Sequence, residues 1–135
     1  MMSTASPPRA VSLCLVKADM YREFLTPDDE EVYEATGEWP DVDESGARVL
    51  TLHDDAGQSV FFSYDAVGRS VRIRWVNDQG VDMLDVFREG ATSLSFTSGN
   101  SAQGISVGFH AGECAGTLEI QVTPRISVSD RLLFQ

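Results

Sequence analysis

Apolar and polar residues alternate with a period of two along most of the chain after residue 47. In one segment, Val71, Ile73 and Trp75 alternate with two arginines. Because successive side chains of a strand point to opposite faces of a sheet, this spacing buries one face and exposes the other. The same alternation recurs in residues 60–64, 94–96, 105–109 and 118–122. The pattern predicts a series of half-buried β-strands.

Short turns rich in Asp, Asn and Gly separate these strands. Four residues that end in glycine, as in 54–57, 65–68 and 77–80, are typical of a type I turn followed by a left-handed residue. A longer loop is expected over residues 110–116, and Pro124 is expected to mark a bend before the last strand. The turns leave no room for crossover helices, so consecutive strands are predicted to pair antiparallel in a meander.

One hairpin can be predicted at the level of single residue pairs. With residues 77–80 as its loop, apolar residues face apolar residues and an arginine faces an aspartate. Each such pair contributes about 0.2–1 kcal/mol. The expected cross-strand partners are Val71 with Val86, Ile73 with Leu84, and Arg72 with Asp85.

The first third of the chain follows helix rules instead. Thr26 as the N-cap and Pro27 at the first helical position predict a helix that ends at Gly37. Asp19 is expected to cap a further short helical turn over residues 20–25. The sequence therefore predicts one or two short helices near the N-terminus.

The remaining segments complete the predicted fold. Residues 10–16 predict a strand before the helices, and residues 41–46 predict a polar loop after them. We predict a mainly β (β-rich α+β) fold, an antiparallel meander of about 8 strands that forms a curved sheet, a sandwich or an up-and-down barrel. At 135 residues the chain is expected to hold a disordered N-terminal tail at residues 1–9 and a single domain at residues 10–135.

The two cysteines, Cys14 and Cys114, have neither a metal-ligand nor a redox spacing. A disulfide between them would close a loop of about 100 residues. Two reduced thiols are the favoured alternative, because residues 10–16 are too short for the apolar core of an export signal. No segment approaches the roughly 18 apolar residues of a membrane span. These observations predict a cytoplasmic protein.

Acidic residues are concentrated in one stretch of the chain. From Asp19 to Asp55 there are thirteen Asp or Glu residues and only two arginines, Arg22 and Arg48. Residues 1–57 carry 13 acids and 4 bases, whereas the rest of the chain carries 8 acids and 6 bases. A field of this sign repels nucleic acid and anionic membranes, and attracts basic proteins.

We predict that part of this stretch binds a basic partner. Four aromatic residues (Tyr21, Phe24, Tyr33 and Trp39) lie among the acids, and aromatic anchors ringed by charge are typical of protein interfaces. The simpler alternative is that the charge only keeps the protein soluble. The predicted partner-binding residues are Asp28, Asp29, Glu30, Glu31, Glu34, Glu38, Trp39, Asp41, Asp43 and Glu44.

Three patterns imitate chemical sites without completing one. Residues 41–46 match the start of an EF-hand calcium loop, but Leu52 stands where the loop needs a bidentate glutamate. His53 and His110 lie beside predicted turns, and no third residue is identifiable that would orient a nucleophile formed by Cys114 and His110. We therefore predict no catalytic residue, no metal site and no cofactor.

Charged residues in the region of the predicted hairpin are expected to neutralise one another. Asp82 and Asp85 would suit general acid–base catalysis only inside a cleft, and exposed positions explain them more simply. Local pairing with acids is predicted, instead of an anion or nucleic-acid site, for Arg69, Arg72, Arg74 and Arg88.

The leading hypothesis is a non-enzymatic acidic binding or inhibitor protein. Its most concrete form is an immunity protein or antitoxin that occludes a basic partner such as a toxic nuclease. One alternative is a structural homo-oligomer subunit that uses residues 126–134 as an edge strand, and the sequence leaves monomer and homodimer open. Another is a small-ligand-binding β-barrel carrier with a pocket lined by Phe61, Phe62, Trp75, Phe96 and Phe109.

Overall fold

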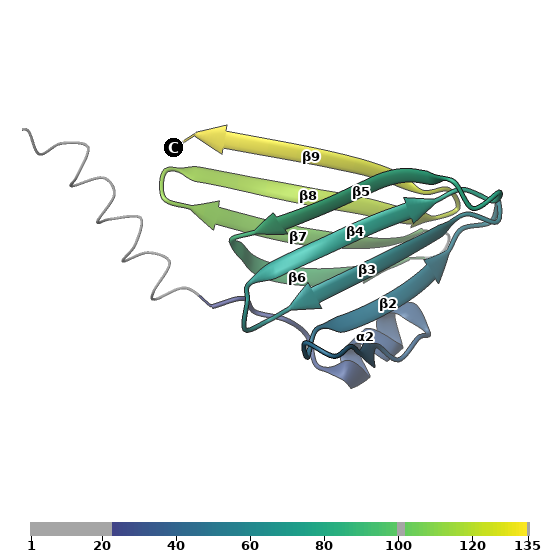
Figure 1. The fold of residues 1–135 in the computed structure, drawn as a ribbon, viewed down its shortest axis with the longest axis horizontal. Coiled ribbons are helices and arrows are strands. Elements are labelled where there is room, and N and C mark those ends of the chain that lie inside the picture. The colour runs from purple at the N-terminus through teal and green to yellow at the C-terminus, as the bar shows by residue number, and fades with distance from the viewer. Residues whose placement is uncertain (1–22, 100–101, 135) are drawn as a thin grey trace, which may run out of the picture.

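The computed structural model describes residues 23–99 and 102–134, which form one helix and nine strands (Figure 1). The helix, α2, spans Asp29–Thr36. The strands are β1 (Asp41–Val42), β2 (Arg48–His53), β3 (Ser59–Asp65), β4 (Ser70–Val76), β5 (Asp82–Glu89), β6 (Ala91–Ser98), β7 (Gln103–Ala111), β8 (Cys114–Thr123) and β9 (Ser127–Phe134). All the segments that alternate in the sequence lie in these strands, so that prediction is confirmed.

The strands form two antiparallel sheets that pack face to face. The first sheet has the order β1-β2-β3-β4-β5 and the second has the order β6-β7-β8-β9, so each strand pairs with its neighbours in the chain. Figure 1 shows the first sheet in front of the second, with α2 below the β2 edge. The mainly β fold and the antiparallel meander are confirmed. Of the three architectures left open, the two layers correspond to a sandwich.

The chain passes from one sheet to the other across a single residue, Gly90. Gly90 has a φ of 85°, and the N–H groups of Gly90 and Ala91 donate to the carbonyl of Arg69 at 2.9 and 3.0 Å. Arg69 itself has a φ of 52°, although the turn pattern predicts Gly68 as the left-handed residue. That prediction is wrong by one residue. A Cβ at Gly68 would come within 2.7 Å of Asp65 Oδ2, so a side chain there would require the Asp65 carboxylate to move.

The core lies between the sheets and is built from the alternating apolar positions. Phe62 and Ile73 of the first sheet, and Val107 and Ile120 of the second, have almost no exposed surface. Burying a side chain of this kind contributes about 1.5–3 kcal/mol. The Phe96 ring meets the Phe62 ring edge-on, with centroids 6.4 Å apart. Apolar contact between the layers therefore holds the sandwich together.

The aromatic residues predicted to line a ligand pocket do not share one. Phe61 lies on the outer face of the first sheet, where the Arg74 guanidinium is 5.5 Å from its ring centroid. Phe62 and Phe109 are buried in the core, and Phe96 packs against that core. These inner rings fill the space between the sheets, so the pocket prediction is wrong.

Three turns of the first sheet repeat one design. The residue that opens each turn accepts two backbone N–H bonds on its side-chain oxygen, from the residues two and four positions later, at 2.8–3.0 Å. These opening residues are Asp43, Asp54 and Asn77. Each turn ends in a left-handed glycine, namely Gly46 (φ 91°), Gly57 (φ 83°) and Gly80 (φ 82°). The predicted turn chemistry is confirmed for residues 54–57 and 77–80.

The β4–β5 hairpin has the predicted faces but not the predicted register. The expected pairs are replaced by Ile73 with Val86, Trp75 with Leu84, and Arg74 with Asp85. One cause is the loop, because Asn77 N–H donates to the Val81 carbonyl at 2.9 Å and the strands resume one residue later than expected. The other cause is a bulge beside Trp75, which adds one more residue to β5. A shift of two residues leaves every side chain on its predicted face.

α2 begins two residues later than predicted. Asp28 is the N-cap instead of Thr26, because its Oδ1 accepts from Glu31 N–H at 2.8 Å and Glu31 Oε1 accepts from Asp28 N–H at 3.1 Å. This capping box satisfies two backbone donors, whereas a threonine cap alone satisfies one. Gly37 ends the helix as predicted, and its N–H donates to the carbonyl of Tyr33.

Other boundaries also differ from the prediction. Leu25 is not helical, because it forms a parallel bridge with Ser93 on the β6 edge. The two-residue strand β1 lies within the predicted loop 41–46. β7 and β8 continue into the predicted loop 110–116, so only residues 112–113 remain as a turn. Each difference arises where a neighbouring strand offers backbone partners that local sequence does not reveal.

Some predictions fall outside the described residues. They are the disordered tail at 1–9, the strand at 10–16, the Asp19 cap and the pairing of Cys14. Pro124 lies in the turn between β8 and β9, as predicted. Within the described part of the chain, no helix has the length and apolar composition needed to cross a bilayer.

Candidate functional site

α2 lies along one edge of the sandwich, and its contacts decide which side chains point outward. Val32 is fully buried in the core. Arg48 on β2 donates to both carboxylate oxygens of Asp29, at 3.1 and 3.4 Å. Gln103 on β7 donates to the last two carbonyls of α2, both at 3.2 Å. The helix is therefore attached to both sheets.

The predicted partner-binding residues lie between the N-cap of α2 and the β1–β2 turn, in α2, the segment after it, β1 and that turn. Residues 23–47 contain ten acids and no base. Four of these carboxylates already have structural roles, because they form the capping box, bind Arg48 or hold a turn. They are Asp28, Asp29, Glu31 and Asp43.

Residues 41–46, which match the start of a calcium loop, form β1 and the β1–β2 turn, and the Asp43 carboxylate is used for hydrogen bonds within that turn. Asp43 accepts a hydrogen bond from the Ser45 hydroxyl at 2.7 Å and from the N–H groups of Ser45 and Ala47. The bond from the Ser45 side chain is the main reason that the pKa of Asp43 is lowered. Among the described residues, no group of three or more His, Cys, Asp or Glu side chains is placed to hold a metal ion.

The other five predicted carboxylates have no basic partner among the described residues. Glu30, Glu34, Glu38, Asp41 and Glu44 are all exposed, and none joins an ion pair formed within residues 23–99 and 102–134. Like charges on one side of a molecule add to a negative potential that screening removes only over about 8–10 Å. We call these five residues, together with Trp39, the acidic face.

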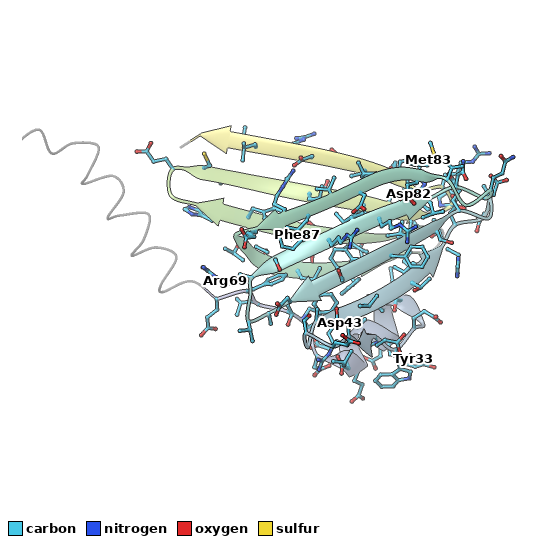
Figure 2. All side chains as sticks on the ribbon, in the orientation of Figure 1. Tyr33, Asp43, Arg69, Asp82, Met83 and Phe87 are labelled. Atoms are coloured by element: carbon cyan, nitrogen blue, oxygen red, sulfur yellow. The ribbon has the colours of Figure 1, made fainter. Side chains whose placement is uncertain are left out.

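Trp39 stands beside these carboxylates with its ring exposed. It stacks on Tyr33 of α2, with ring centroids 4.7 Å apart and planes inclined by 13°. Trp39 is 57% exposed and Tyr33 is 43% exposed. Figure 2 shows Tyr33 beside α2, pointing away from the two sheets. An exposed tryptophan ringed by charge is typical of the centre of a protein interface.

The structure shows which aromatic residues of the acidic stretch are buried in the core and which are exposed. Phe24 is buried in the core, whereas Tyr33 and Trp39 point outward. Tyr21 lies outside the described residues. The one available signal was Val32, the only branched aliphatic residue of α2, because it marks the buried side of the helix and places Tyr33 away from it.

A cleft of about 640 Å³ lies between α2 and β6. Its lining combines the carboxylates of Glu31 and Glu34 with the apolar side chains of Leu25, Leu94 and Phe96. Through Glu34 the cleft adjoins the acidic face. It gives that part of the molecule a concave apolar surface beside the exposed rings.

A second cleft, of about 430 Å³, lies at the N-terminal end of α2. Asp29, Arg48 and Tyr64 line it, and the Tyr64 hydroxyl is buried with no hydrogen-bond partner among the described residues. Burial, and then the charge of Asp29, raise the pKa of Tyr64 to about 12 against the opposing effect of Arg48. The phenol is therefore neutral at physiological pH.

Two acids of β5, Asp82 and Asp85, are neutralised by arginines, whereas the acidic face has no ion pair among the described residues. Within the hairpin, Arg72 binds Asp85 at 2.7 Å and Arg74 binds Asp82 at 3.0 Å, so the predicted local pairing is confirmed for both. Arg88 instead reaches Asp130 on β9 with two bonds of 2.7 Å, which link the two sheets. The hydrogen bonds from arginine lower the pKa of both Asp85 and Asp130.

The histidines and Cys114 are not arranged as a nucleophile and its base. His53 Nδ1 lies 2.9 Å from the Ser59 hydroxyl oxygen at the exposed end of β2. His110 lies opposite Ala115 in the β7–β8 pair, and Cys114 lies one position nearer the turn. Because adjacent positions in a strand pair point to opposite faces, His110 and Cys114 lie on different sides of the sheet.

Comparison with known proteins gives one informative match. No protein-family model matches the sequence, and no curated protein sequence matches it. The fold is similar to a chain in the solved structure of a contact-dependent growth inhibition toxin–immunity protein complex from Klebsiella pneumoniae 342. The match has a TM-score of 0.68 at 19% identity, and covers 80% of this chain and 96% of that chain. At this level of identity the likeness establishes a shared fold.

Proposed function

We propose that this protein is a non-enzymatic inhibitor of the immunity-protein type, which binds a basic toxin and covers its active site. The observation that carries the proposal is the fold shared with a chain of a toxin–immunity protein complex. Acidic charge alone does not carry it, because an acidic surface also serves solubility. The shared fold and the unneutralised acidic face both fit an inhibitor of a cationic protein.

The acidic face is the proposed contact surface. Its carboxylates accelerate encounter with a positively charged partner, and the Trp39 ring supplies apolar area that such a contact buries. A toxin that cleaves nucleic acid needs a cationic active site, because it must bind phosphates. We therefore propose a nuclease as the class of toxin, and the cytoplasm as the place where the two proteins meet.

We expect a toxin gene beside the gene of this protein, and co-expression of the two proteins tests the proposal. The expected result is that growth arrest by the toxin is relieved, that the two proteins co-purify, and that their association slows as salt rises. The variant Glu34→Gln/Glu38→Gln should associate about tenfold more slowly at low ionic strength. It should keep its free energy of unfolding within about 0.5 kcal/mol, because both side chains are exposed.

The matched control removes the same charge from neutralised acids. Asp82→Asn/Asp85→Asn should associate with the toxin at a rate within about twofold of the original protein, because these acids already bind arginines. Growth arrest by this protein alone would contradict the proposal, since it would assign the protein the toxin's role. If association slowed equally in both variants, the protein could still be an inhibitor, but the acidic face would not be its contact surface.

A further inference from the structure

The molecule twice combines an aromatic ring, an arginine and a carboxylate. The Arg74 guanidinium lies 5.5 Å from the Phe61 ring centroid while it binds Asp82. The Arg88 guanidinium lies 5.3 Å from the Phe109 ring centroid while it binds Asp130. In each case one guanidinium interacts with a ring face and a carboxylate at the same time.

Trp39 has an exposed ring and carboxylates near it in the sequence, but no arginine lies over it among the described residues. Tyr33 stacks on one face of the ring, and Trp39 remains 57% exposed. Glu38 precedes it and Asp41 follows two residues later, both exposed and without an ion pair among the described residues. No cation lies over the Trp39 ring within the described part of the chain.

We infer that the Tyr33–Trp39 stack receives an arginine side chain of the basic partner, which lies flat on the Trp39 ring and donates to the flanking carboxylates. The inference rests on the proposed function for the existence of that partner, and it specifies the chemistry that the partner presents. A planar guanidinium stacks on indole and keeps N–H donors at its edges for carboxylates. A lysine ammonium is a compact, strongly hydrated charge that does not match both surfaces.

Hexa-arginine and hexa-lysine peptides test this chemistry without the toxin. They carry the same charge, so attraction to the acidic face as a whole is similar for both, and the ratio of their dissociation constants reports the preference for guanidinium. We expect the original protein to bind hexa-arginine more tightly. The variant Trp39→Leu, which keeps apolar bulk but has no aromatic face, should reduce that preference by about two- to fivefold. Isothermal titration calorimetry at low salt measures the four constants.

A second exposed aromatic residue provides the control. Phe87 is 62% exposed on β5, the opposite edge of the first sheet from α2 (Figure 2). Phe87→Leu should leave the preference for arginine unchanged. Because the ratio compares two peptides on one protein, a loss of stability in Trp39→Leu affects both constants alike and does not imitate the expected result.

The outcomes separate this inference from the proposed function. A preference that is the same in Trp39→Leu and in the original protein would overturn the arginine inference, as would failure of both peptides to bind. Relief of toxin-induced growth arrest would still support the proposed function in either case. Conversely, a preference lost in Trp39→Leu would support the inference even if the neighbouring gene product proved not to be a toxin.

Discussion

Two acidic regions of this protein differ in how their charge is used. In the β4–β5 hairpin, Asp82 and Asp85 each bind an arginine of the neighbouring strand. In the acidic face beside α2, five carboxylates have no such partner among the described residues. Asp82 and Asp85 are therefore neutralised within their own sheet, whereas the five carboxylates of the acidic face can attract positively charged molecules.

The difference follows from where the bases stand in the sequence. Antiparallel pairing of β4 with β5 brings Arg72 to Asp85 and Arg74 to Asp82, which lie 13 and 8 positions apart in the sequence, so arginines of β4 neutralise these two acids of β5. No base lies between residues 23 and 47, and among the described residues the arginine that pairs with an acid of this region, Arg48, binds Asp29. A run of acids without interleaved bases is therefore a better sign of an available surface than net charge.

The largest effect is expected at an acid with a structural role outside the acidic face. Asp54 accepts hydrogen bonds from Ala56 N–H, from the backbone and side chain of Gln58, and from Ile126 N–H in the turn between β8 and β9. Asp54→Ala should lower the free energy of unfolding by about 2–4 kcal/mol, because buried donors lose a charged acceptor. Urea denaturation followed by circular dichroism measures it.

Asp43→Ala is the matched control for that experiment. Asp43 holds the same kind of turn but is exposed and bonds only within it. Its replacement should cost clearly less than that of Asp54. Equal losses would show that the turn itself, and not the link to Ile126 in the β8–β9 turn, carries the stability.

A smaller effect is expected at Asp28, the N-cap of α2, which is the helix that carries Glu30 and Glu34 of the acidic face. Asp28→Ala removes the acceptor for Glu31 N–H and should lower the free energy of unfolding by about 1 kcal/mol. Asp28→Asn keeps an acceptor oxygen and should cost only part of this. If Asp28→Ala left the free energy of unfolding unchanged, the capping box would not define the start of α2. In that case amide hydrogen exchange in the first turn of α2 would also be unchanged.

The smallest effect concerns the acid limb of stability. Arg88 lowers the pKa of Asp130, so in the range below about pH 5 the unfolded chain takes up this proton before the folded protein does. The ion pair therefore contributes fully at neutral pH, and its contribution is lost as pH falls through the folded pKa. Asp130→Asn should flatten the fall in stability between about pH 5 and pH 2. An unchanged slope in urea denaturation across this range would show that the pair does not persist in solution.

The sequence predicts most of the sheets because strand formation here is a local property. Alternation identified the buried faces, and the Asx residues at 54 and 77 with their following glycines identified two turns. The register was missed because the bulge beside Trp75 depends on how the whole hairpin twists and packs. Asp28 and Glu31 carry the capping-box spacing, so the sequence does contain the signal that places the N-cap at Asp28 in place of Thr26.

The sequence predicts the acidic stretch itself, but it does not predict which of its acids form internal hydrogen bonds or ion pairs and which do not. The ion pair between Asp29 and Arg48 joins residues 19 positions apart and requires α2 to lie on the β2 edge. The stacking of Tyr33 on Trp39 requires the chain to reverse at Gly37. Both are tertiary contacts that no local pattern encodes.

The direct passage from β5 to β6 across Gly90 has a consequence for synthesis on the ribosome. Each sheet is one uninterrupted stretch of chain, so contacts within a sheet are close in sequence and form early. A nascent chain that has emerged only as far as Glu89 carries the whole first sheet, but the second sheet does not yet cover the face that holds Leu50, Phe62 and Ile73. Until the second half of the protein emerges, that exposed apolar layer is a binding surface for chaperones and the point at which misassembly competes with folding.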